Sequence, residues 1–280
     1  SVLIRSLPYT GQWSAVEIVD NTMVMCHSEV DLNCAYYCFG LEPAWWPWLA
    51  FDQTVTGKDL RDIPGIGNFR DDEVLYPASS VLAMGLGSAS GCMQYAHMKM
   101  ATIPPPFGAA CQVGRQLRVD RPIPLSESRC LGALWEIFQD NFNATEQMAV
   151  DDMIELIGTS SPETAALSEV YLIWGASQAK SKSIHRQVHC ESLGYVRDGL
   201  LGAQYPTERS MMLLLALTGW AVQQNKLDGR SLQVLGSRWC RNIQLRRELS
   251  TLLDPVWRAL SSLYESGQRY FTVNKEIVEA

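Results

Sequence analysis

Two histidines and a cysteine in the C-terminal half of the sequence have residue types that bind metals. His185, His189 and Cys190 lie within the stretch SIHRQVHCES. On a helix the two histidines, four residues apart, would share one face, and such a pair can hold zinc or copper. A metal-binding oxidoreductase is therefore one function class to consider. A solvent-exposed histidine pair that caps a helix is the simpler interpretation, so we expect no metal here.

A second group with metal-ligating side chains lies near the N-terminus. Cys26, His27, Cys34 and Cys38 fall within thirteen residues, and the last two are spaced as C-x-x-x-C. Zinc sites favour tighter C-x-x-C pairs with a matching second pair elsewhere in the chain. Buried free thiols, which pack as small apolar side chains, are the alternative that the sequence favours.

A glycine-rich segment between residues 85 and 91 is the third candidate. Gly85, Gly87 and Gly91 form a G-x-G-x-x-x-G pattern between an apolar run and an expected helix. Such glycines can bring the backbone close to a phosphate or an adenosyl cofactor at a helix N-terminus. This predicts, as an alternative function, a cofactor-binding enzyme of the methyltransferase or NAD type. Glycines that permit close helix packing are the other interpretation, and with it we expect no cofactor.

The remaining sequence signatures do not indicate catalysis. No Gly-x-Ser-x-Gly, phosphate-loop lysine or His-Glu-x-x-His pattern occurs, so the usual hydrolase and nucleotidase motifs are absent. The acidic run FRDDEV, at 69–74, is typical of a solvated loop. We therefore assign no catalytic residue from the sequence.

Charge is unevenly distributed along the chain, whose net charge is -7. Residues 1–80 carry four basic and eleven acidic side chains, whereas 226–258 carry seven basic and three acidic ones. This asymmetry favours head-to-tail association or contact with an anionic surface. The residues expected to face lipid or ribonucleoprotein are Arg238, Arg241, Arg246 and Arg247.

Apolar periodicity predicts the elements that would position these residues. Helices are expected over 128–142, 161–180, 206–225, 231–253 and 254–271, from three- and four-residue apolar spacing and from N-terminal signals such as Ser161-Pro162. The helix over 206–225 should be central and buried, because apolar residues surround most of its circumference. Segments 13–27 and 29–40 suit either helices or strands. We expect an all-α fold of multi-helix bundles with Pro-rich connections, divided into a 1–180 region and a 181–280 region with the basic helix.

A resemblance to a known family supports this expectation. In the N-terminal part the pattern comprises VLIRSLP, Gly11, AVEI at 15–18, Asp31-Leu32, Pro43 and Pro47. In the middle it comprises Ala89-Ser90, Cys92-Met93, Tyr95, Met100, Phe107-Gly108 and Cys111. Over about the first 115 residues the order of these residues resembles the matrix protein of influenza-type viruses, the orthomyxovirus matrix family.

The resemblance implies an all-helical structural protein that polymerises into a layer beneath a viral envelope and links membrane to ribonucleoprotein. The chain departs from that family where FRDDEVLYP replaces a basic cluster, and no Cys-Cys-His-His zinc pattern follows Cys111.

On this basis we expect a viral matrix protein rather than an enzyme. Its partners would be further copies of itself, an anionic membrane surface and viral ribonucleoprotein, with no small-molecule substrate. It would be located in the virion beneath the envelope, in the host cytoplasm or nucleus and at the inner face of the plasma membrane, and it would not be secreted. The two enzyme classes described above remain the alternatives.

Overall fold

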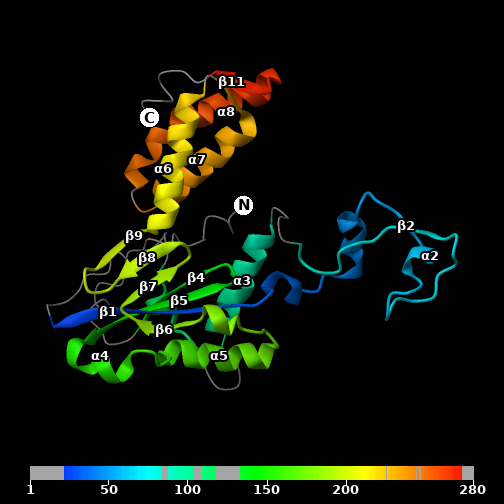
Figure 1. The fold of residues 1–280 in the computed structure, drawn as a ribbon. Coiled ribbons are helices and arrows are strands. Elements are labelled where there is room, and N and C mark those ends of the chain that lie inside the picture. The colour runs from blue at the N-terminus through cyan, green and yellow to red at the C-terminus, as the bar shows by residue number, and fades with distance from the viewer. Residues whose placement is uncertain are drawn as a thin grey trace.

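The chain combines sheets and helices, so the all-α expectation is wrong. A computed structural model describes residues 22–83, 88–103, 109–117, 133–224, 226–243, 245 and 247–272. Four antiparallel sheets occur within these residues, one of four strands, one of three and two of two. Figure 1 shows the larger sheets at the centre of the molecule and three helices of the C-terminal region packed together at one end.

The four-stranded sheet has the order β4-β5-β1-β6. Strand β1 (Met23–Asp31) pairs along its whole length with β5 (Asn141–Ala149), and β4 (Leu134–Phe138) forms a hairpin with β5. Strand β6 (Ile184–Gln187) pairs with the other edge of β1 through a bulge. The register places Asp31 opposite Asn141, so the end of β1 meets the turn of the β4–β5 hairpin.

The two faces of this sheet differ in polarity. Alternate residues of the strands put Val30, Phe142, Trp135 and Ile137 in one apolar core, as expected when side chains point to opposite faces. The other face carries buried polar side chains, namely His27, Glu29, Asp31, Glu136, Asn143 and Thr145.

The helix predicted over 128–142 is a strand where it is described. Leu134, Trp135 and Phe138 satisfy helical spacing, but they lie in β4. Because both faces of this strand are buried, apolar residues occur on each, and their positions match a helix by coincidence. Segment 29–40 likewise contributes the end of β1 and the short 3-10 helix η2 (Ala35–Cys38).

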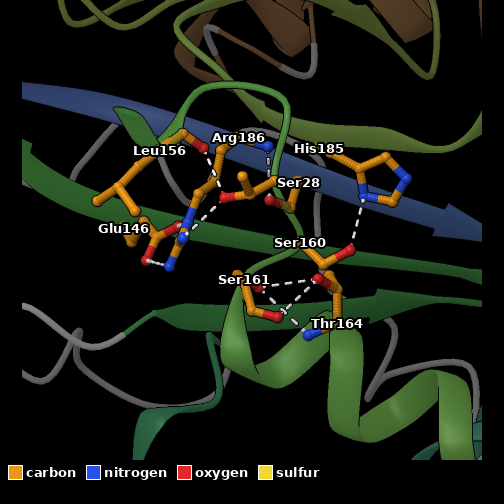
Figure 2. A network of polar contacts seen from close by, with 9 residues as sticks. Ser28, Glu146, Leu156, Ser160, Ser161, Thr164, His185 and Arg186 are labelled. Atoms are coloured by element: carbon orange, nitrogen blue, oxygen red, sulfur yellow. Dashed lines mark hydrogen bonds and ion pairs between the residues drawn. The ribbon is translucent and has the colours of Figure 1, made fainter. Parts of the chain in front are cut away.

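Helices cover the apolar face of the sheet. α3 (Ala89–Thr102) and α5 (Pro162–Trp174) supply Met93, Ala101, Leu167 and Tyr171 to its core, and α4 (Val150–Leu156) follows β5 directly. α5 confirms the prediction from Ser161-Pro162, because the Ser161 side chain accepts a hydrogen bond from the Thr164 N–H (Figure 2). Residues 89–102, which carry part of the resemblance described above, thus form a helix that packs on the sheet.

A three-stranded sheet lies against β1 on the polar face of the four-stranded sheet. It contains β7 (His189–Ser192), β8 (Tyr195–Asp198) and β9 (Ala203–Pro206). The Met25 N–H donates to the Gly199 carbonyl at 3.1 Å, and the Gly199 N–H donates to the Val188 carbonyl at 2.7 Å. Gly199 thus joins the two sheets through its backbone.

The C-terminal region confirms three predicted helices. α6 (Glu208–Gln223) and α8 (Asp254–Ser266) occur within the predicted segments. α7 (Gly229–Ile243) begins two residues before the segment predicted over 231–253, whose last part is the 3-10 helix η6 (Arg247–Leu253). They enclose an apolar core with the small β10 (Lys226–Asp228) and β11 (Tyr270–Thr272) sheet. The expectation that α6 is buried is wrong, because Met212, Leu213, Leu215 and Trp220 are exposed.

Residues 43–75, which follow η2, extend away from the sheets (Figure 1). This arm contains η3 (Pro43–Leu49), β2 (Val55–Thr56), α2 (Gly57–Leu60) and β3 (Val74–Leu75). Two further 3-10 turns, η4 (Val113–Arg115) and η5 (Lys180–Lys182), connect the larger elements. Among the described residues, no helix is long and apolar enough to cross a membrane.

Candidate active site

Two aspartates meet at one end of the polar sheet face. Asp31 is the last residue of β1, and Asp140 lies in the turn between β4 and β5. The Leu32 N–H donates to the Asp140 carbonyl at 3.0 Å, which ties the two segments together immediately beside both carboxylates. The site is therefore fixed by the backbone pairing of the sheet and not by a flexible loop.

The charge of Asp31 acts on the Asp140 carboxyl group. Burial raises the pKa of Asp140, and the negative charge of Asp31 raises it further, while Lys182 opposes the shift. Like charges held close together disfavour the ionised form. A cation at this position would relieve that repulsion.

Lys182 supplies a positive charge to the same site. Its Nζ lies 2.6 Å from Oδ2 of Asp31, and this hydrogen bond raises the pKa of the lysine. The loop that carries Lys182 is held against β1 by the Asn33 N–H donating to the Ser177 carbonyl and the Ala179 N–H donating to the Asp31 carbonyl, each at 2.8 Å. The lysine ammonium itself is largely exposed to solvent.

An aromatic side chain completes the edge of the site. Tyr36, on η2 just after Asp31, is buried, and its hydroxyl donates to Oε1 of Gln139 at 2.7 Å. Gln139 precedes Asp140 and has a left-handed backbone with φ of 58°, a conformation that non-glycine residues adopt uncommonly. Tyr36 therefore contacts the turn that carries the second carboxylate.

A buried ion pair lies on the same polar face of the sheet as Asp31. Arg197 of β8 lies 3.3 Å from Glu136 and also contacts the His27 ring, and all three side chains are buried. Burial and the neighbouring guanidinium lower the pKa of His27 to about 4, whereas burial raises the pKa of Glu136. Asn141 donates to Glu29 on the same face. These groups hold the three-stranded sheet on the polar face.

The two histidines considered as an alternative metal pair lie on different strands. His185 is in β6, where its Nδ1 lies 3.3 Å from the Ser160 hydroxyl (Figure 2). His189 and Cys190 are in β7, which belongs to the other sheet; His189 is exposed beside Asp198, and Cys190 is buried. The shared helix face that the metal interpretation needs does not form, because the segment is extended.

The Cys26, His27, Cys34 and Cys38 group is also dispersed. Cys26 is buried under the apolar face and His27 points to the polar face beside Arg197, while Cys34 and Cys38 are exposed on η2. In the part of the chain that the structure describes, no three His, Cys, Asp or Glu side chains are grouped to hold a metal ion. Cys26 is thus a buried free thiol, and Cys34 and Cys38 are exposed free thiols.

The glycine segment gives no support to a dinucleotide-type fold. Gly85 and Gly87 lie outside the described residues, and Gly91 is buried in the first turn of α3. The named sheets of the described chain are antiparallel, whereas that fold needs parallel strands joined by helices.

The basic residues lie on the helical region. Arg238 and Arg241 are exposed on α7 and line a groove of about 610 Å³ with Gly194, Ser210, Gln233 and Asn242. Arg241 donates to the Leu193 carbonyl and stacks over the Tyr195 ring at 5.8 Å. Arg246 lies outside the described residues, and for Arg247 only the backbone, in η6, is described. Their lipid- or ribonucleoprotein-facing role stays a prediction.

Sequence reasoning did not identify Asp31, Asp140 or Lys182 as a site. The signal that the sequence offered was a run of β-formers that ends at Asp31. Treating 128–142 as helix removed the hairpin turn and with it the second carboxylate.

Comparisons with known proteins give matches at the level of fold. No family model matches the chain, and no curated protein matches it. The foamy viral protease-reverse transcriptase in complex with an RNA/DNA hybrid aligns with a TM-score of 0.50 and 10% identity, over 92% of this chain and 26% of that chain. The foamy viral protease-reverse transcriptase dRH in complex with double-stranded DNA gives 0.49 and 10%, over 91% and 33%. Telomerase from Candida albicans with a telomeric RNA fragment gives 0.35 and 10%, over 91% and 45%.

This chain thus spans less than half the length of each of these three chains. At a TM-score of 0.50 the first alignment shows a similar fold, and at 10% identity it shows the fold alone. The matrix-protein interpretation is corrected by these findings. The fold is mixed rather than all-helical, and the structure that shares this fold at a TM-score of 0.50 is a foamy viral protease-reverse transcriptase, not a matrix protein.

Proposed function

We propose that this chain carries the catalytic sheet and the adjoining helical region of a template-directed nucleic-acid polymerase. The observation that carries the proposal is that Asp31 and Asp140 come together at one end of the sheet, where the Leu32 N–H donates to the Asp140 carbonyl. The similarity in fold to a reverse transcriptase supports it. The reaction would be transfer of a nucleotidyl group to the end of a nucleic-acid strand.

The donor set suits magnesium. Mg²⁺ is usually bound by one or two carboxylates, with water and substrate phosphates completing its octahedral shell. Asp31 and Asp140 provide two carboxylates without a third acidic, histidine or cysteine ligand among the described residues. Carboxylate oxygens alone would favour Mg²⁺ or Mn²⁺ over softer metals.

The surrounding residues have separate parts in this proposal. When bound, the metal supplies Lewis-acid stabilisation of the charge that develops during an in-line displacement at phosphorus. Lys182 neutralises Asp31 and provides positive charge close to where a triphosphate would bind. Tyr36 forms an apolar wall beside the turn and shields one side of the site from water.

A nucleic-acid partner follows from the same proposal. The foamy viral reverse transcriptase is described with an RNA/DNA hybrid and with double-stranded DNA. The groove beside Arg238 and Arg241 offers exposed guanidinium groups to a phosphate backbone, and phosphate contacts supply most sequence-independent affinity. Self-association, an anionic membrane surface and a virion location remain predictions from the sequence.

Primer extension tests the function. The full 280-residue chain would be mixed with an annealed DNA primer on an RNA or DNA template, deoxynucleoside triphosphates and Mg²⁺ or Mn²⁺. We expect extension by the unaltered chain and its abolition by Asp31→Asn and by Asp140→Asn, because each replacement removes a metal-binding charge without changing size. Asp71→Asn is the matched control, since Asp71 is an exposed partner of Arg61 on the arm.

Two results would contradict the proposal. Extension that survives both active-site substitutions would show that these carboxylates are not the site. Binding of primer and template without any extension would restrict the chain to nucleic-acid binding.

A further inference from the structure

The turn that carries Asp140 is held from below by helix α3. Nε2 of Gln94 donates to the Ile137 carbonyl, and Oε1 of Gln94 accepts from the Gln139 N–H, both at 2.7 Å. One side chain thus pairs with backbone groups on both sides of Phe138. Gln94 is 1% exposed, so losing these bonds would leave buried polar groups without partners.

His97, one helical turn further along α3, binds the same turn. Its Nδ1 lies 2.8 Å from the Gln139 carbonyl, which can only accept, so Nδ1 carries the proton. Nε2 then accepts from the hydroxyl of Tyr171 on α5, with the two ring centroids 5.5 Å apart. Both rings are fully buried.

The protonation states agree with this geometry. Burial lowers the pKa of His97 to about 4 and raises that of the Tyr171 hydroxyl well above its usual value. At neutral pH the imidazole is uncharged and has one donor and one acceptor, and the phenol keeps its proton. The Tyr171 hydroxyl therefore donates to Nε2 of His97, and Nδ1 of His97 donates to the Gln139 carbonyl.

The turn needs this support because its backbone is unfavourable. Gln139 has φ of 58°, and non-glycine residues held in sparsely populated backbone regions persist when their surroundings fix them. Three hydrogen bonds from α3 reach the peptide groups from Ile137 to Gln139. The next residue is Asp140.

We propose that Gln94, His97 and Tyr171 form a positioning network that fixes the 139–140 turn and thereby sets where the Asp140 carboxylate meets a divalent cation. The inference rests on the proposed function, because it assigns Asp140 as a metal ligand. These three are positioning residues, and they act on the metal through the turn. Groups that orient metal ligands are expected to affect affinity strongly, and their loss typically costs 10–100-fold.

Mn²⁺ titration of the full chain, followed by electron paramagnetic resonance of the free ion, tests the network without any need for turnover. We expect Gln94→Met and His97→Leu each to weaken Mn²⁺ binding about 10-fold. His97→Asn should restore most of the affinity, since the asparagine amide nitrogen can donate from the position of Nδ1. Tyr171→Phe keeps the ring and removes the hydroxyl, so this variant should lose an intermediate amount of Mn²⁺ affinity.

Stability is controlled with Leu167→Ala, which opens a cavity in the same core on α5. Urea unfolding of every variant would show which are comparably destabilised, and Leu167→Ala should keep wild-type Mn²⁺ affinity. If the Gln94 and His97 variants bind Mn²⁺ like Leu167→Ala, the positioning role is overturned.

The outcomes also separate this inference from the function on which it rests. Absence of Mn²⁺ binding that depends on Asp140, judged with Asp140→Asn, would overturn both. Binding that depends on Asp140 but is unchanged in Gln94→Met and His97→Leu would overturn the network alone.

Discussion

His97 shows how a single buried residue can make stability depend on pH. Its pKa is about 4 in the folded chain, against an ordinary value of 6.5. Between these values the unfolded chain binds a proton that the folded chain does not, so stability falls as the pH decreases from 6.5 toward 4. His27 has a similar shift and contributes in the same direction.

Replacing His97 with asparagine should therefore flatten the pH dependence of stability. We expect the free energy of unfolding of His97→Asn to fall less steeply between pH 6.5 and 4, by up to about 1.4 kcal/mol per pH unit. Urea unfolding of the two proteins at several pH values measures the difference. Parallel curves for wild type and variant would show that His97 takes up its proton in the folded state as readily as in the unfolded one.

Sequence motifs could not predict the site formed by Asp31 and Asp140. Asp31 and Asp140 lie far apart in the sequence, and neither belongs to a dense cluster of acidic residues. Residue types alone offered His185, His189 and Cys190 as candidate metal ligands, although no metal was expected there, and these residues lie on strands of two sheets. Spacing has a chemical meaning only when the type of element is known.

At the scale of elements, Gly199 marks a point of close approach between the two larger sheets. A Cβ on this residue would lie 1.8 Å from the Met25 carbonyl oxygen and 3.1 Å from that of Val188. Both neighbours are backbone atoms, so relief requires moving a strand. Gly219, in α6, has no heavy atom within 4 Å of its Cβ position.

These two glycines predict opposite effects of the same substitution. Gly199→Ala should lower the free energy of unfolding by about 1–3 kcal/mol through overpacking. Gly219→Ala should raise it by about 0.5–1 kcal/mol, because alanine is the better helix former. Thermal or urea unfolding of both variants provides the check, and a Gly199→Ala protein as stable as wild type would mean that the sheets separate easily at this point.

Elements with local signals were predictable, and those without them were not. α5 has a serine N-cap followed by proline, and α8 begins at Asp254-Pro255, so both were located from sequence. β4 and β5 have no such signal, because burial on both faces removes the alternation that marks a strand. Their identity depends on pairing with β1, which is a property of distant sequence.

For the whole molecule, the exposed arginines of α7 predict how nucleic-acid binding responds to salt. Arg238 is exposed on the groove, whereas Arg241 is engaged with Leu193 and Tyr195. Arg238→Gln should weaken binding of a primer and template and reduce the slope of log affinity against log salt by about 1. Fluorescence anisotropy over a KCl series measures that slope.

Arg258 on α8 provides the control for this measurement. It is exposed and already paired with Asp254 on the same helix, so Arg258→Gln should leave the slope unchanged. Equal effects of the two substitutions would indicate attraction by overall charge, without a defined path through the groove.

The ladder between β1 and β5 has a consequence for how the sequence can diverge. It holds Asp31 beside the Asp140 turn through N–H and C=O groups, which nearly every amino acid supplies equally. Neighbouring side chains can therefore be exchanged through many generations while the separation of the two carboxylates stays constant. Such a chain can keep its architecture after most of its side chains have been exchanged, and a similar fold does occur at 10% identity over 92% of its length.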